Sequence, residues 1–256
     1  FLIIANLKMN LMSRAEVHQY LQVLTREVAA KNKTFSEVIM CPPMLYQNEF
    51  AHLPEHFARG AQNMFWEKSG SYTGEISPVM LKNDGIEYVL IGHSERRLYG
   101  GEDNEIVRMK TQSALKNLLI PIVCIGETEE EKKKGKTIEV LRDQLASIFT
   151  GLSKLQAEKI ILAYEPRWAI GSDRIPETSE IMEVRVMIKA FLEEMFDEST
   201  ASRIRVLYGG SVKSAYLGSV SWEALMDGVL VGRESLFPYE LVKMMSLHEQ
   251  YLKEIQ

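Results

Sequence analysis

The stretch that decides the fold spans residues 160–171 and reads IILAYEPRWAIG. Its apolar run presents one carboxylate, Glu165, and then meets Pro166. Proline fixes its own backbone and pushes the preceding residue toward extended geometry, so we expect Glu165 at the carboxyl end of a buried strand. A carboxylate held there, beside a loop that ends in glycine, is suited to act as a general base away from water. A glutamate that merely ends a strand is the alternative.

Similar apolar runs recur along the chain, each flanked by turn residues. They cover residues 2–5, 38–41, 88–91, 122–125, 160–164, 204–208 and 229–231, with a weaker run at 57–62. Continuous runs of this kind are typical of strands buried on both faces of a parallel sheet. Most intervals between them have helical spacing, and the segment Ser13-Arg14-Ala15-Glu16 predicts a capped helix that reaches about Ala30.

Alternating strands and helices, without a linker or low-complexity stretch, favour a single α/β domain over residues 1–256. Eight strands would close into a parallel (β/α)8 TIM barrel, and a doubly wound open sheet is the alternative that periodicity alone does not exclude. In a barrel, the carboxyl ends of all strands face one mouth, so polar residues that follow the strands converge there.

Composition and charge exclude several classes of function. The chain of 256 residues has 46% hydrophobic and 25% charged residues, as in soluble globular proteins. A net charge of −5 gives no basic surface for nucleic acid, and no apolar run approaches the roughly 18 residues of a membrane span. Cys41 and Cys124 lie in apolar runs, which indicates buried, reduced thiols in the cytoplasm. We expect no metal and no cofactor, because neither metal-ligand spacing nor a nucleotide-binding loop is present.

Seven motifs lie at or beside the predicted strands, in order along the chain. They are Asn6-Leu7-Lys8-Met9-Asn10, Tyr72-Thr73-Gly74-Glu75, Gly92-His93-Ser94-Glu95-Arg96-Arg97, Cys124-Ile125-Gly126-Glu127, Tyr164-Glu165-Pro166, Tyr208-Gly209-Gly210-Ser211-Val212 and Asp227-Gly228-Val229-Leu230-Val231-Gly232. In order and spacing they resemble the triosephosphate isomerase family nearly end to end. The resemblance implies a TIM barrel, a homodimer, and isomerisation of a phosphorylated small sugar in glycolysis and gluconeogenesis.

By this resemblance, the catalytic residues are Asn6, Lys8, His93, Glu95 and Glu165. Glu165 takes the proton next to the substrate carbonyl, Lys8 stabilises the developing oxyanion, and Asn6 holds Lys8 in position. A helix that begins directly after His93 disfavours the imidazolium, so we expect a neutral imidazole that donates to the carbonyl. Glu95 is a nearby carboxylate, and stabilisation of a helix start is its alternative role.

The resemblance also assigns the phosphate group to backbone amides of Gly171, Ser211, Gly232 and Arg233. A short helix after the last strand would point its amino end at the dianion. The segment 62–76 is long for a barrel loop and rich in polar and aromatic residues. In the family it reaches into the neighbouring subunit, which implies a homodimer with Thr73 near the partner's site.

Four departures from the family pattern leave the substrate open. Arg167 replaces a small apolar residue, residues 172–175 differ in the lid, Arg233 replaces a second glycine, and Leu7 replaces tryptophan. We expect the Arg233 guanidinium to pair with the phosphate or with Asp173 of the lid. Three hypotheses follow: a triosephosphate isomerase, an isomerase of the same mechanism acting on a tetrulose phosphate such as erythrulose phosphate, and an inactive barrel that only binds sugar phosphates.

Overall fold

The computed structural model describes residues 1–31, 36–170 and 176–254. Within these ranges, eight parallel strands pair in chain order and close into a barrel, with β8 pairing to β1. The strands are β1 (Leu2–Asn6), β2 (Glu37–Cys41), β3 (Phe57–Ala61), β4 (Tyr88–Ile91), β5 (Ile120–Ile125), β6 (Ile161–Tyr164), β7 (Arg205–Tyr208) and β8 (Gly228–Val231). The expected (β/α)8 barrel is therefore confirmed, and the doubly wound open sheet is excluded.

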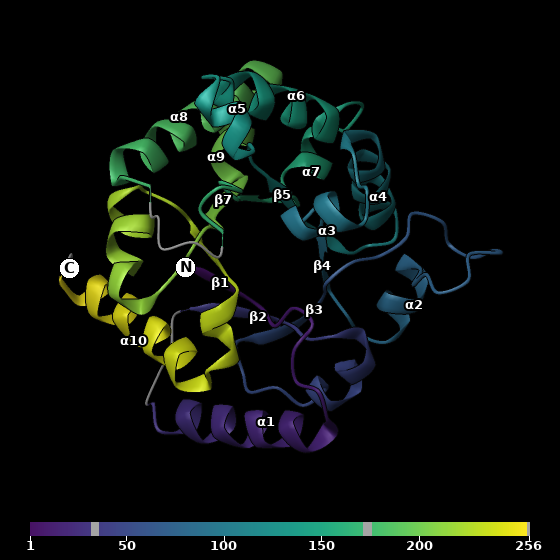
Figure 1. Ribbon diagram of the computed structural model, residues 1–256, viewed down its shortest axis with the longest axis vertical. Coiled ribbons are helices and arrows are strands. Elements are labelled where there is room, and N and C mark those ends of the chain that lie inside the picture. Colours follow the sequence, from purple (N-terminus) through teal and green to yellow (C-terminus); the bar gives the residue numbers. More distant parts are fainter. Residues whose placement is uncertain (32–35, 171–175, 255–256) are drawn as a thin grey trace.

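Helices surround the strands in Figure 1. The α-helices are α1 (Arg14–Ala29), α2 (Pro78–Asn83), α3 (Ser94–Tyr99), α4 (Asn104–Lys116), α5 (Glu129–Lys133), α6 (Thr137–Phe149), α7 (Lys154–Ala157), α8 (Thr178–Met195), α9 (Glu198–Arg203) and α10 (Pro238–Glu254). Shorter helical turns are η1 (Met44–Phe50), η2 (Ser214–Tyr216), η3 (Gly218–Glu223) and η4 (Arg233–Leu236). The predicted cap of α1 is present, because the Ser13 side chain accepts from the Glu16 N–H. In the described part of the chain, no helix combines the length and apolar character needed to cross a membrane.

The strands are apolar on both faces because they separate two parts of the core. All five residues of β1 are buried. Ile4 lies in the cluster inside the barrel together with its strand partner Leu230. Its neighbour Ile3 lies in the larger cluster between the strands and the helices, as does Val229. This double burial accounts for the near-continuous apolar runs that predict the strands.

Two glycines let the backbone pass close to Glu165 at the barrel mouth. A Cβ atom on Gly126 would lie 1.9 Å from the Glu165 carbonyl oxygen. A Cβ atom on Gly209 would lie 2.9 Å from Glu165 Cγ. Any larger residue at either position would displace this segment, so the two glycines fix the space in which the Glu165 side chain lies.

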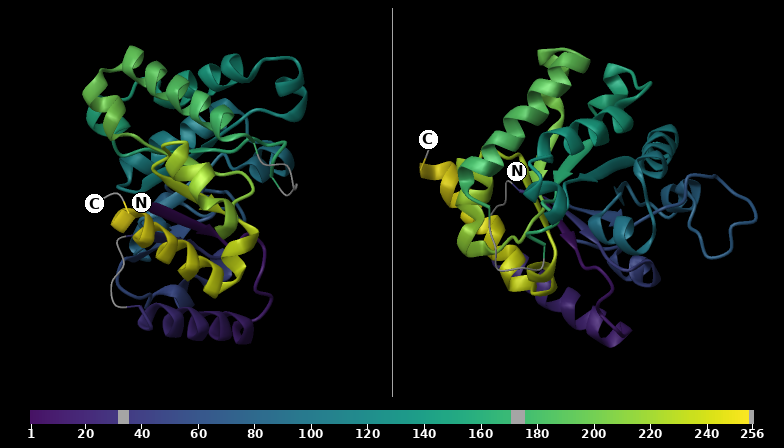
Figure 2. Two further views of the ribbon diagram at one scale, coloured as in Figure 1. Left: turned by 90° about the vertical axis from the view of Figure 1, so that its left-hand side faces the viewer. Right: turned by 45° about the horizontal axis from the view of Figure 1, so that its top comes forward.

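The loop of residues 62–76 lies beside α2 in Figure 1 and projects from the barrel in Figure 2. Residues 67–75 are all exposed, and a Cβ atom on Gly74 would meet no atom within 4 Å. The loop is ordered partly by its own aromatic rings, because Phe65 stacks on Trp66 with ring centroids 3.9 Å apart and lies 4.5 Å from the Tyr72 ring. Among the described residues, the hydrogen bonds and ring contacts of its outer half stay within the loop itself.

Candidate active site

The carboxyl ends of the strands surround a cavity of about 950 Å³. Most of the residues predicted for the site line it: Asn6, Lys8, His93, Glu95, Glu165, Ser211, Gly232 and Arg233. Gly171 and Asp173 lie outside the described residues. The structure thus brings together side chains that are up to 227 positions apart in the sequence, from Asn6 to Arg233.

Lys8 has an unusual backbone, with a φ angle of 51° in the left-handed region. This conformation costs a non-glycine residue about 1–3 kcal/mol and persists only where neighbours enforce it. The Asn6 side-chain oxygen accepts from the Lys8 N–H at 3.0 Å, and the Gln62 amide donates to the Lys8 carbonyl at 2.8 Å. Asn6 and Gln62 therefore hold the strained residue that directs an ammonium group into the cavity.

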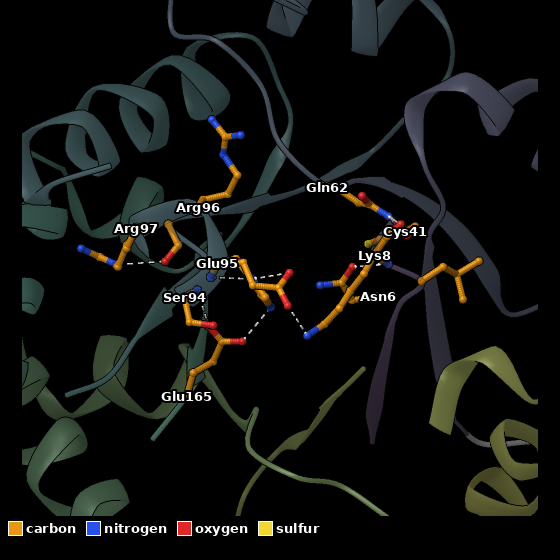
Figure 3. A network of polar contacts seen from close by, with 12 residues as sticks. Asn6, Lys8, Cys41, Gln62, Ser94, Glu95, Arg96, Arg97 and Glu165 are labelled. Carbon is orange, nitrogen blue, oxygen red and sulfur yellow. Dashed lines mark hydrogen bonds and ion pairs between the residues drawn. The ribbon is translucent and has the colours of Figure 1, made fainter. Parts of the chain in front are cut away.

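The Lys8 ammonium and the Glu95 carboxylate form an ion pair at 2.7 Å (Figure 3). Both side chains are partly exposed, at 27% and 43%. Lys8 follows β1 and Glu95 is the second residue of α3, so the pair joins two sides of the cavity. The pair fixes the ammonium, but it also leaves Lys8 with one negative partner before any substrate enters.

His93 immediately precedes α3, and its Nδ1 atom accepts from the Glu95 N–H at 3.2 Å. An atom that accepts a hydrogen bond carries no proton, so this contact assigns the ring proton to Nε2. His93 Nε2 lies 3.1 Å from Glu165 Oε1. The predicted helix start therefore orients the imidazole, with its donor atom directed at the carboxylate.

Glu165 is 2% exposed and lies just beyond β6. One of its oxygens faces His93, and the other accepts from the Ser94 N–H at 3.0 Å. Burial acts to raise the pKa of this carboxyl, but His93, the Ser94 N–H and Lys8 together hold the pKa below its ordinary value. The carboxylate is consequently ionised and available to accept a proton, although both oxygens are occupied in this arrangement.

The pKa of His93 differs from the sequence-based expectation. Burial acts to lower it, but the charge of Glu165 and the hydrogen bond to it raise the pKa above its ordinary value of 6.5. The helix start was expected to dominate and keep the imidazole neutral. The direction of this shift is opposite to the one that the helix start alone would give, because the sequence does not reveal that the two side chains touch.

The residues predicted to bind phosphate lie along the β7 and β8 ends of the cavity. The Ser211 hydroxyl donates to the Ala169 carbonyl at 2.6 Å, which joins the loop after β7 to the loop after β6. A Cβ atom on Gly232 would lie 3.3 Å from Lys8 Cε. Arg233 begins η4, the short helix predicted after the last strand.

Sequence reasoning missed two supporting groups. In the sequence Gln62 marks only the start of a long loop, and its contact to Lys8 spans 54 positions. Glu127 is 1% exposed and accepts from Trp168 Nε1 at 2.8 Å and from the Tyr164 hydroxyl at 3.3 Å. Burial raises the pKa of Glu127 despite these contacts. A charged residue inside an apolar motif is the one sequence signal that could have identified it.

Among the described residues, no cluster of three or more His, Cys, Asp or Glu side chains is arranged to hold a metal ion. The chemical groups gathered in the cavity are a buried carboxylate, an imidazole and an ammonium. At the mouth of a (β/α)8 barrel, these groups define an enzyme that moves protons on a small anionic substrate.

Comparison with known proteins identifies the family. The triosephosphate isomerase family model matches residues 1–248. The chain is 45% identical over 204 residues to the triosephosphate isomerase of Dictyoglomus turgidum, covering 79% of this chain and 82% of that one. It is 41% identical over 237 residues to the triosephosphate isomerase of Alkaliphilus oremlandii, covering 92% and 94%. The chain belongs to the triosephosphate isomerase family and is an aldose–ketose isomerase.

Proposed function

We propose that the chain interconverts D-glyceraldehyde 3-phosphate and dihydroxyacetone phosphate through an enediolate, as one domain spanning residues 1–256. The observation that carries the proposal is the buried Glu165 carboxylate, with His93 at 3.1 Å, in the same cavity as the Lys8 ammonium. The relatives are named triosephosphate isomerases, which supports the choice of a triose phosphate.

In the proposed mechanism, Glu165 removes the proton from the carbon next to the substrate carbonyl. The electron pair of that C–H bond forms the C=C bond of the enediolate, and the π pair of the carbonyl moves to its oxygen. The resulting enediolate oxygen is stabilised by Lys8 and by the Nε2–H of His93. Protonated Glu165 then returns the proton to the adjacent carbon, while the hydroxyl proton moves between the two oxygens through His93. Because both Glu165 oxygens are occupied by Ser94 and His93, the carboxylate has to turn toward the substrate before it reacts.

Asn6 and Glu95 act through Lys8 in this proposal. Asn6 stabilises the left-handed backbone of Lys8, and Glu95 holds its ammonium at 2.7 Å. Backbone amides of Gly171, Ser211, Gly232 and Arg233 bind the phosphate. The last three border the cavity, while Gly171 lies outside the described residues.

A tetrulose phosphate is the second candidate substrate. Arg167 and Arg233, both departures from the family pattern, line the cavity and change its charge at two points. The deciding measurement is kcat/KM for D-glyceraldehyde 3-phosphate against an erythrulose phosphate. We expect the triose phosphate to be preferred. A higher value for the tetrulose phosphate would replace the proposed substrate, and binding of both without turnover would indicate an inactive barrel.

We also propose a homodimer formed through the loop of residues 62–76. The exposed outer half of this loop supports it, as do large apolar side chains on segments that follow β1, β2 and β4. Examples are Met12 at 69% exposed, Leu45 at 76% and Tyr99 at 82%. Such side chains are expected to be covered by a partner.

The dimer proposal predicts that Thr73→Arg weakens association and lowers activity with it. Thr73 lies in the outer half of the loop, where a long charged side chain would oppose burial against a partner. Analytical ultracentrifugation and activity measured over a dilution series test this. The control is Thr25→Arg, an exposed position on α1. A wild-type protein that is fully active as a monomer at nanomolar concentration would contradict the proposal.

We also propose that the protein is located in the cytoplasm. Cys41 and Cys124 are buried free thiols, and burial raises the pKa of both. Reduced structural cysteines are usual in proteins of a reducing compartment.

A further inference from the structure

Arg233 lines the cavity, and no described residue pairs with its charge. Its side chain forms no hydrogen bond or ion pair with the residues that the structure describes, although it lines the same cavity as Lys8 and Glu165. The Lys8 ammonium, in contrast, is already paired with Glu95 at 2.7 Å. The guanidinium is therefore a cation that remains available to a bound anion.

Arg233 lies beside the residues whose backbone amides are expected to bind the substrate phosphate. It directly follows Gly232, whose Cα approaches the Lys8 side chain so closely that an added Cβ would lie 3.3 Å from Lys8 Cε and 3.7 Å from Nζ. Ser211 borders the same cavity from the loop after β7. Arg233 is exposed, so its long side chain is free to adopt a conformation over this end of the cavity.

The charges around the cavity indicate that Arg233 contributes to binding an anionic substrate. A phosphate dianion that enters the site meets the ionised Glu165 and also Glu234, the residue after Arg233, which lines the cavity as well. Lys8 is partly neutralised by Glu95, so the further cations that line the cavity, Arg167, Lys213 and Arg233, act beside the backbone amides to offset the two carboxylates. Of these three, Arg233 directly follows Gly232, whose amide is expected to bind the phosphate. A guanidinium matches two phosphate oxygens at once and is permanently charged.

We propose that the side chain of Arg233 binds the phosphate group of the substrate and makes this site more selective for phosphorylated substrates. The inference rests on the proposed function and assigns a residue to its substrate recognition. The contact exists in both the bound substrate and the transition state, so its loss acts mainly on KM.

The test compares substrates with and without phosphate. In Arg233→Gln, which removes the charge and leaves a shorter polar side chain, we expect kcat/KM for D-glyceraldehyde 3-phosphate to fall about 10- to 100-fold, the loss expected for a charge-assisted hydrogen bond. Turnover of unphosphorylated D-glyceraldehyde should change less than about twofold. Arg233→Lys, which retains the charge without the fork, should give an intermediate loss. The matched control is Arg26→Gln on α1, which removes one exposed charge from a residue that does not line this cavity.

Binding separates this proposal from the proposed function. Calorimetric titration with glycerol 3-phosphate, compared with glycerol, requires no turnover. Weaker binding of glycerol 3-phosphate by Arg233→Gln, at constant ionic strength, supports the role of Arg233 even if wild-type protein fails to isomerise trioses. Unchanged binding, or an equal loss of activity on both forms of glyceraldehyde, would overturn it.

Discussion

Shortening Glu165 to aspartate is the sharpest test of its assignment as the base. Removing one methylene group withdraws the carboxylate by about 1.5 Å. Contacts now at 3.1 Å to His93 and 3.0 Å to the Ser94 N–H would lengthen to about 4.5 Å, beyond hydrogen-bond range. A displacement of about 1 Å in a reacting group can cost about 100-fold in rate, so we expect kcat to fall about 10²- to 10³-fold. This corresponds to about 2.7–4 kcal/mol in activation free energy.

The fold of the Glu165→Asp variant should persist, since one buried methylene group contributes only about 1 kcal/mol. Circular dichroism and a coupled steady-state assay measure the two effects separately. The control Glu165→Gln keeps the length and removes the basic oxygen, and it should lose more activity than the aspartate variant. A Glu165→Asp enzyme with native circular dichroism and kcat within about threefold of wild type would refute the assignment.

Two further predictions concern stability. Glu102 is 2% exposed on its side chain and pairs with the buried Lys110 at 2.6 Å. Glu102→Ala should therefore lower the free energy of unfolding by about 3–5 kcal/mol in urea titration, and the exposed control Glu105→Ala should lower it far less. Equal losses in the two variants would contradict this. The pKa of Glu165 is lowered, so its contribution is present above its ordinary value of 4.5 and lost as pH falls through the lowered value. The pKa of His93 is raised, so its contribution is present below 6.5 and lost as pH rises through the raised value. The stability difference between wild type and His93→Gln should therefore be largest between about pH 4.5 and 6.5, and a difference independent of pH would argue against the pair.

The sequence predicts most of the strands well because they are buried on both faces. The apolar run at 160–164 and its proline locate β6 and the position of Glu165 beyond it. Even the weak run at 57–62 corresponds to a strand, β3. Closure of the barrel did not follow from periodicity, since an open doubly wound sheet has the same apolar runs. The choice between them depended on the order of motifs that resemble a known family.

The site is predictable as a set of residues but not as a network of contacts. Strand-end positions correctly bring Lys8, His93 and Glu165 to one cavity. The left-handed backbone of Lys8 could not be read from sequence, because lysine seldom adopts it and the enforcing group, Gln62, is 54 positions away. The direction of the His93 pKa shift has the same origin, since it depends on a contact with a residue 72 positions further along the chain.

The resting contacts of Glu165 impose a condition on catalysis. Burial alone would raise its pKa and favour the protonated carboxyl, which cannot act as a base. His93 and the Ser94 N–H keep it ionised, but each contact that stabilises the charge also weakens its basicity and occupies an oxygen. A substrate must therefore replace both contacts, and removal of water from the cavity must then let burial raise the basicity of the freed carboxylate. In the proposed mechanism, substrate binding and base activation are therefore a single event at Glu165. A group that binds the phosphate far from the reacting carbon still affects the reaction, because the binding free energy it supplies helps to release Glu165 from Ser94 and His93.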